Sequence, residues 1–213
     1  MTEVKHTNHP LFARFYERLS RLGGDAGQDG HRRELLAGLR GNVIEVGAGN
    51  GLNFEFYPQA VERVLAVEPE PYLRKKARDA ARRAAVPVEV VDGTAESLPA
   101  ADGEFDAGVF SLVLCSVPNQ VAALTEMRRV IKPGGDLRFY EHVISDNPRV
   151  KRLQRAIEPI WKRAGGGCHL TRDTAKSIDQ AGFELTDWRE LEFKPNVLAT
   201  PVAKHILGSA RRS

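Results

Sequence analysis

Three alternate glycines follow a short apolar stretch and form the strongest local signal for ligand binding. The stretch Asn42–Val46 has the pattern of a buried strand, and Gly47, Gly49 and Gly51 come directly after it. Glycines accept positive φ angles and leave room for a ligand to reach main-chain N–H groups. A dinucleotide fingerprint would place its third glycine or an alanine at position 52, where this chain has Leu52. The spacing therefore favours S-adenosylmethionine over NAD.

Two carboxylates flank this loop in the predicted fold. Glu68 ends the second apolar strand, where a carboxylate can accept hydrogen bonds from both ribose hydroxyls of a nucleoside. A solvated acid at the strand end is the alternative. Glu45 lies inside the first strand and could hold the loop amides, or the cationic amino end of the cofactor, or have a purely structural role. Asn53 and Pro69, beside these groups in sequence, are assigned to the same cofactor site.

Two further segments complete the predicted cofactor site. A polar turn after the third strand contains Thr94, Ala95 and Glu96, which we place at the adenine edge. The fourth strand is apolar enough to be buried on both faces, and its end, at Ser111 and Leu112, is expected to line the methyl-transfer pocket.

Candidate catalytic groups are few. His142 follows Glu141 at the carboxyl end of the fifth strand, where ligands bind in such sheets, so it is the candidate general base, with a structural role as the alternative. His169 lies beside Cys168, but neighbours in sequence form no dyad unless folding joins their side chains. Cys115 and Cys168 lie far apart, without CxxC spacing or a companion His/Cys set, so we expect neither a metal site nor a disulfide. Cys115 is interpreted as a small buried hydrophobe.

The elements that must position these residues alternate between strands and helices. Strand patterns lie at 42–46, 64–68, 86–91, 105–112 and 136–142, and helical segments, such as 122–130, separate most of them. This alternation predicts an α/β fold with a doubly wound, largely parallel sheet. Five further predicted elements follow, namely a basic helix at 149–163, a glycine turn at 165–167, a helix at 171–181 with Thr171 and Asp173 at its N-cap, and strands at 183–188 and 202–207.

The chain is expected to form one domain of 213 residues with four segments. They are an N-terminal helical cap at 1–40, a cofactor-binding core at 41–145, a lid or substrate region at 146–182 and C-terminal strands at 183–213. Within the cap, a helix carries Leu11, Phe12, Phe15, Tyr16 and Leu19, and a loop spans 23–30. The basic helix at 149–163 could cover the acceptor or lie on a membrane surface, although Pro159 should break or kink it.

Composition restricts the partners. The formal net charge is only +3, so no nucleic-acid partner is expected. No leader pattern and no run of ~18 apolar residues is present in the sequence, which predicts a cytoplasmic protein.

With these positions laid out, the chain resembles the class I S-adenosylmethionine-dependent methyltransferases through EVGAGNG, VEPEP, AESLP, EFD and RVIKPGG. It is also similar to the methyltransferase-like thiol S-methyltransferases through GNGLNFEFYP, SLVLCSVPNQ, FYEHV and GCHLTRDT. The resemblance implies a seven-stranded, Rossmann-like methyltransferase sheet with an antiparallel edge strand. It also implies S-adenosylmethionine as cofactor, and a small alkyl thiol or hydrogen sulfide as methyl acceptor.

Two departures and two alternatives accompany the resemblance. Thr94 stands where many methyltransferases have an aspartate for the adenine amino group, and the N-terminal membrane anchor of the family's animal members is not recognisable. The acceptor could instead be an oxygen, nitrogen or carbon of a lipid, quinone or natural product, or the fold could bind cofactor without turnover. A nucleic-acid methyltransferase is not favoured, because Cys115 to Pro118 replace the Asn/Asp-Pro-Pro-aromatic tetrad.

Overall fold

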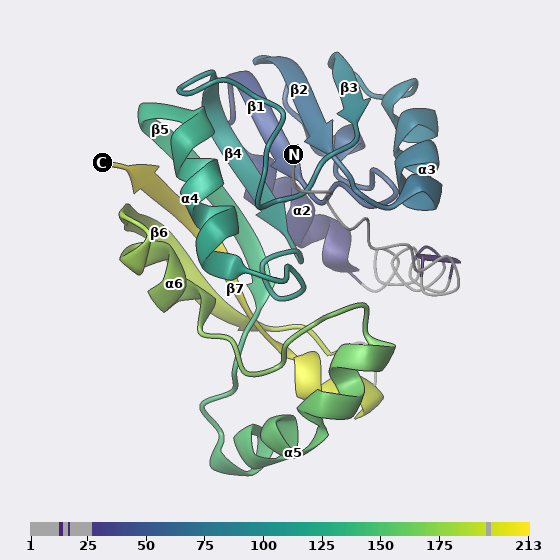
Figure 1. The fold of residues 1–213 in the computed structure, drawn as a ribbon, viewed down its shortest axis with the longest axis vertical. Coiled ribbons are helices and arrows are strands. Elements are labelled where there is room, and N and C mark those ends of the chain that lie inside the picture. Colours follow the sequence, from purple (N-terminus) through teal and green to yellow (C-terminus); the bar gives the residue numbers. More distant parts are fainter. Residues whose placement is uncertain (1–12, 15–16, 18–26, 195–196) are drawn as a thin grey trace.

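A computed structural model describes residues 13, 14, 17, 27–194 and 197–213 (Figure 1). Leu11, Phe12, Phe15, Tyr16 and Leu19 of the predicted N-terminal helix lie outside these residues. Glu17, which falls in the same segment and is described, accepts a hydrogen bond from the Tyr72 hydroxyl at 2.5 Å.

One seven-stranded sheet organises the described residues, in the order β3-β2-β1-β4-β5-β7-β6. Strands β1 to β5 are parallel to one another, and β7 is antiparallel to both β5 and β6. The predicted sheet is confirmed, with its antiparallel strand one position inside the edge. The strands are β1 (Gly41–Val46), β2 (Val61–Val67), β3 (Val88–Val91), β4 (Phe105–Ser111), β5 (Ile131–His142), β6 (Phe183–Glu192) and β7 (Lys204–Arg212).

Helices cover both faces of the sheet. Leu35 and Leu36 of α2 (Asp29–Leu36) and Ala77 of α3 (Pro71–Ala81) belong to the core on one face. Met127 of α4 (Gln120–Val130) and Ile178 of α6 (Thr174–Gln180) belong to the core on the other face, which Figure 1 shows in front. The helix α5 (Pro148–Ala164) extends away from the sheet. Two short 3-10 helices complete the described part of the fold, η2 (Phe54–Phe56) and η3 (Val197–Val202).

Side-chain caps fix where four of these helices begin, among them α3, α4 and α6. Glu70 accepts the Leu73 N–H at 2.7 Å before α3, Asn119 accepts the Ala122 N–H at 3.1 Å before α4, and Asp173 caps α6. A cap satisfies one of the backbone N–H groups that the first helical turn leaves unpaired. Asp173, not Thr171, is therefore the cap, and α6 starts three residues later than predicted.

Three local predictions need correction. The predicted loop at 23–30 ends early, because helix α2 already contains Asp29 and Gly30, with Arg32 bonded to Asp29 at 3.0 Å. Helix α5 is continuous through Pro159, so the proline does not break it as the sequence allowed. The pairing of β5 begins at Ile131 and shifts in register before Asp136, so the predicted stop at 132–135 lies inside the strand as an irregularity.

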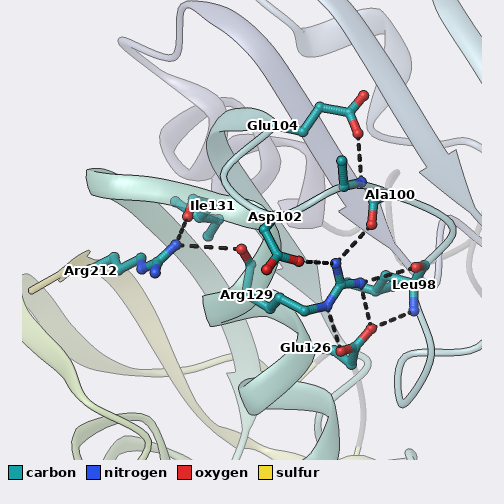
Figure 2. Close-up of polar contacts among 9 residues, drawn as sticks. Leu98, Ala100, Asp102, Glu104, Glu126, Arg129, Ile131 and Arg212 are labelled. Carbon is teal, nitrogen blue, oxygen red and sulfur yellow. Dashed lines mark hydrogen bonds and ion pairs between the residues drawn. The ribbon is translucent and has the colours of Figure 1, made fainter.

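Arg129 fastens the loop between β3 and β4 to helix α4 (Figure 2). Its guanidinium donates to the carbonyls of Ala100 and Leu98 at 2.8 and 3.2 Å and forms ion pairs with Asp102 and Glu126 at 2.8 Å. The bonds to the carboxylates of Glu126 and Asp102 raise the pKa of Arg129. The loop that follows the predicted adenine turn is thus held in place from its far end.

Candidate functional site

A cleft opens beside the carboxyl ends of β1 and β4, at the point where the strand order reverses, which is the usual ligand site of open α/β sheets. Five of the predicted cofactor residues line it. They are Glu45, Gly47, Asn53, Ser111 and Leu112, joined by Arg32, Ala48, Asn50 and Leu52. Arg32 comes from α2, and no pattern in the sequence marks it as a site residue.

The glycine loop has no room for a side chain at two of its glycines, Gly47 and Gly51. Gly47 has φ +71°, and a Cβ atom there would lie 2.5 Å from the Val113 side chain. Gly51 has φ +79°, and its Cβ would lie 2.8 Å from the side chains of Ala80 and Phe54. Both positions therefore require glycine for conformational and steric reasons, and Gly47 exposes main chain to the cleft.

Glu68 fastens the same loop from the end of β2. Its carboxylate accepts the Gly49 N–H at 2.7 Å and the Glu70 N–H at 2.9 Å. Burial raises the pKa of Glu68 to about 7, against the lowering effect of these two bonds. Pro69 follows, and its carbonyl accepts a bond from Arg74 at 2.9 Å. The carboxylate keeps further lone pairs for a ligand, because each of its oxygens can accept a second bond.

Glu45 sits at the floor of the cleft with two side-chain partners. Its carboxylate accepts the Asn53 amide at 2.9 Å and the Tyr57 hydroxyl at 2.7 Å. Burial raises the pKa of Glu45 to about 7. The sequence prediction did not include Tyr57, although it follows the glycine loop closely. The carbonyl oxygen Oδ1 of Asn53 is buried and has no hydrogen-bond partner among the described residues, so it can accept from a ligand.

The predicted adenine turn lies outside the lining of this cleft. Thr94 pairs with Ser97 in an isolated bridge, and the Ala95 side chain is part of the core. Glu96 accepts the Asn119 N–H at 3.1 Å, which ties the turn to the start of α4. The adenine contact remains a prediction for this turn, through backbone groups in particular.

Leu112 closes the end of β4 in an unusual backbone conformation. It has φ +60°, which is rare for a residue with a branched side chain, and its N–H donates to the Tyr140 carbonyl at 2.7 Å. Such local strain persists only where the surrounding structure enforces it, often at ligand sites.

Glu141 holds the loop that follows Leu112. Its buried carboxylate accepts the N–H groups of Val113, Leu114 and Cys115 at 2.8, 2.9 and 3.2 Å. Burial raises the pKa of Glu141 well above its ordinary value. The carboxylate thus fixes the position of Cys115 next to the end of β5.

The fold brings together three residues that the sequence separates. Cys115, His142 and Cys168 are all buried, and their Sγ and ring nitrogen atoms lie within 4.8 Å of one another. The Nε2 atom of His142 is 2.7 Å from the Sγ atom of Cys168. The expectation that the cysteines have no companion His/Cys set is therefore wrong, because the contact depends on tertiary structure and not on spacing. The hydrogen bond from Cys168 holds the pKa of Cys115 well below its ordinary range.

His142 itself has one engaged and one free ring nitrogen. Its Nδ1 atom is buried without a hydrogen-bond partner among the described residues. An edge-to-face contact joins its ring to His205 at 6.4 Å, and His205 stacks on Tyr140 at 5.1 Å. Burial lowers the pKa of His205 to about 4, so this neighbour is uncharged near neutral pH.

The helix α5 covers the cysteine cluster. Its Trp161 indole donates to Cys168 Sγ at 3.3 Å, and its Glu158 lies 3.1 Å from the His169 ring. His169 therefore faces α5 and not Cys168. Gln154 is buried and anchors the helix, since it donates to the Pro201 carbonyl at 2.9 Å. Among the described residues, no helix is long and apolar enough to cross a membrane.

Comparison with known proteins agrees with this geometry. Residues 44–139 match the family model described as a methyltransferase domain. The chain is 39% identical over 173 residues to thiol S-methyltransferase TMT1B of Rattus norvegicus, covering 79% of this chain and 69% of the relative. It is 35% identical over 164 residues to thiol S-methyltransferase TMT1A of Homo sapiens, covering 71% and 67%.

Solved structures share the fold at low identity. A SAM-dependent methyltransferase of Methanosarcina mazei superposes with a TM-score of 0.65 at 22% identity, over 80% of this chain and 92% of that one. A geranyl diphosphate methyltransferase superposes with a TM-score of 0.69 at 13% identity, over 88% and 78%. The chain therefore belongs to the class I S-adenosylmethionine-dependent methyltransferases, in the family of the thiol S-methyltransferases TMT1A and TMT1B.

Proposed function

We propose that this methyltransferase transfers the methyl group of S-adenosylmethionine to the sulfur of a small alkyl thiol or of hydrogen sulfide. The cofactor supplies an electrophilic methyl group on a sulfonium. Two relatives named thiol S-methyltransferase support this acceptor class. The observation that carries the proposal is the buried His142 ring at the carboxyl end of β5, whose Nδ1 has no partner among the described residues.

The cleft residues fit the cofactor. Gly47 lines the cleft without a side chain, and the unpartnered Oδ1 of Asn53 offers an acceptor to the cationic amino group. Arg32 would pair with the carboxylate at the same end of the ligand. Glu68 would accept the ribose hydroxyls, and the turn with Thr94 would face the adenine.

The same assignment covers the remaining residues of the predicted cofactor site. Glu45 would orient Asn53, and Gly49 and Gly51 would keep the loop backbone in shape. We place Pro69 beside the ribose, Ala95 and Glu96 beside the adenine, and Ser111 and Leu112 under the methyl-bearing end.

His142 is placed to take the proton of an acceptor thiol. If Nε2 carries a proton and donates it to Cys168, the lone pair is on Nδ1, and that atom can accept the S–H proton. A thiol must react as thiolate, and its ordinary pKa of ~8.5 leaves part of it ionised near neutral pH. A positioned base therefore raises the reactive fraction, while alignment of the acceptor supplies much of the remaining effect.

Acceptors of graded acidity test this role. The variant His142→Asn should lower turnover of an alkyl thiol by about 10²- to 10⁴-fold, the usual contribution of a positioned base. An aromatic thiol that is already ionised at pH 8 should lose much less. His205→Asn is the matched control, since His205 is buried nearby and its Nδ1 is already bonded to the Ala203 carbonyl at 2.9 Å. Equal losses with both acceptors would contradict the proton-transfer role.

We also propose that α5 is a lid over the acceptor, because Trp161 and Glu158 contact the turn that contains Cys168. The competing role is peripheral membrane contact, since Leu153 and Ile160 are 43% and 75% exposed among basic side chains. Co-sedimentation with anionic lipid vesicles decides between them. Binding that disappears at high salt is the result expected for a lid with a basic face. Binding that persists at high salt and is lost in Ile160→Glu would contradict the lid.

A further inference from the structure

The cluster of Cys115, His142 and Cys168 brings together two sulfur atoms and one ring nitrogen, which bind the same class of metal ions. The cysteines follow β4 and α5, and the histidine ends β5, so three separate parts of the chain meet at one buried point. Thiolate sulfur and imidazole nitrogen select zinc and other thiophilic cations over magnesium or calcium. Sites of this type are normally found from close sequence spacing, which is absent here.

The distances suit a tetrahedral cation. With Zn–S bonds of about 2.3 Å and Zn–N bonds of about 2.0–2.1 Å, the ligand atoms of a zinc site lie roughly 3.5–3.8 Å apart. The three atoms here lie within 4.8 Å of one another, with His142 Nε2 and Cys168 Sγ at 2.7 Å. A cation would replace the proton between these two atoms and increase the distance between them by roughly 1 Å. Only side-chain adjustments are needed to reach that geometry.

The backbone around the ligands is already held. Glu141 accepts the Cys115 N–H at 3.2 Å, and the Cys115 carbonyl accepts the His169 N–H at 2.8 Å, which joins the two cysteine loops. Arg172 donates to the carbonyls of Leu114 and Val117 in the same loop. Metal sites depend on such outer contacts to fix their ligands.

We propose that Cys115, Cys168 and His142 bind a thiophilic divalent cation such as Zn²⁺ and leave its fourth position to the sulfur of the methyl acceptor. Three protein ligands with one open position are typical of catalytic zinc, and a coordinated thiol is deprotonated. The acceptor's part in this inference rests on the proposed function. In the loaded protein, the cation replaces His142 as the group that ionises the thiol, because Nε2 coordinates and Nδ1 keeps its proton.

The chemical step balances without a further reactant. The acceptor thiol gives up its proton to solvent on coordination, and a sulfur electron pair then forms the S–CH₃ bond. The methyl–sulfonium bond breaks, and its electron pair stays on the sulfur of S-adenosylhomocysteine. The thioether product carries no charge, so it binds the cation more weakly than the thiolate and can leave.

Metal content and cobalt spectroscopy test the site without any reference to turnover. Reduced protein, purified without a polyhistidine tag or chelator, should contain one equivalent of zinc by mass spectrometry. Substituted Co²⁺ should give the intense near-ultraviolet band of thiolate-to-cobalt charge transfer. Cys115→Ser, Cys168→Ser and His142→Ala should each weaken metal affinity at least about tenfold. His169→Ala is the matched control, because that ring faces Glu158, and it should bind like wild type.

Each outcome decides the question. No bound zinc and no thiolate–cobalt band in protein with two free thiols would overturn the site, as would unchanged binding in a folded Cys115→Ser/Cys168→Ser double variant. Thiol methylation at full rate by metal-free protein would overturn the cation's part in the reaction and leave the proposed function intact. Stoichiometric zinc in a protein that methylates no thiol would retain the site and refute the proposed acceptor.

Discussion

Replacing Glu68 by glutamine isolates the contribution of one buried charge to cofactor binding. The carboxylate ends β2, is 5% exposed and already accepts the Gly49 and Glu70 N–H groups. Its remaining lone pairs are the proposed acceptors for the two ribose hydroxyls. Glutamine has nearly the same shape, but it carries no charge and only one of its two terminal atoms accepts hydrogen bonds.

The size of the effect follows from hydrogen-bond energetics. Bonds to a charged group contribute about 1.5–3 kcal/mol each, against about 0.5–1.5 kcal/mol for neutral pairs. Weakening both ribose contacts should therefore reduce the binding free energy by about 2–4 kcal/mol. At 1.4 kcal/mol per factor of ten, the Kd for S-adenosylmethionine should rise about 30- to 700-fold.

Isothermal titration calorimetry at pH 8, where Glu68 with its pKa of about 7 is mostly ionised, measures this Kd. Glu70→Gln is the matched control, because it makes the same chemical change two residues later, at the cap of α3. That variant should lose about 1 kcal/mol of stability at most and keep its cofactor affinity. A Kd for Glu68→Gln within about threefold of wild type, in a folded variant, would refute the ribose contact.

Three further changes test other parts of the structure. Gly47→Ala should abolish cofactor binding measurable by calorimetry, because the new Cβ atom would lie 2.5 Å from the Val113 side chain. Gly38 also has a positive φ, +74°, but a Cβ atom there meets open space, so Gly38→Ala should cost only about 1–2 kcal/mol of stability. Arg129→Met should lower the free energy of unfolding, measured in urea, by about 2–4 kcal/mol. The control Arg128→Met removes a longer hydrogen bond and should lower it by less than about 1 kcal/mol. Burial raises the pKa of Glu45 from 4.5 to about 7, so the folded state binds its proton more tightly than the unfolded chain and loses stability as the pH rises through this range. In urea titrations, Glu45→Gln should remove that loss and gain up to about 3 kcal/mol over wild type between pH 5 and pH 8.

Each of these has a contrary result. Cofactor binding by Gly47→Ala equal to that of Gly38→Ala would show that the glycine loop tolerates a side chain at position 47. Equal destabilisation by the two arginine variants would show that the Arg129 contacts contribute no more to stability than those of Arg128. A stability difference between Glu45→Gln and wild type that is the same at both pH values would show that Glu45 ionises in the folded state as it does in the unfolded chain.

Local sequence signals predicted the parts of the site that local structure builds. Apolar runs predicted the parallel strands, and the strand before Gly47 fixes the glycine loop at the end of β1. The carboxylate after Val67 had to appear beside that loop, because β1 and β2 are parallel and end at the same sheet edge. The contact between Glu68 and Gly49 confirms that the two signals meet.

Contacts that depend on tertiary packing were not predictable in this way. Cys115 and Cys168 meet because of the direction that the chain takes through α5, and hydrophobic periodicity does not predict that direction. Arg32 reaches the cleft from helix α2, which begins at Asp29 and includes Gly30, although this glycine indicated a loop in the sequence. Charged groups at such positions have no local signature, since only the packing of the helix on the sheet decides which way they face.

Methyl transfer from labelled S-adenosylmethionine to a panel of small thiols, sulfide, phenols and amines tests the central claim most directly. We predict labelled thioether from the thiols, labelled methanethiol from sulfide, no labelled product from the phenols and amines, and loss of turnover in Glu68→Ala. Labelled product from a phenol or an amine with none from any thiol would contradict the assignment of sulfur as the acceptor.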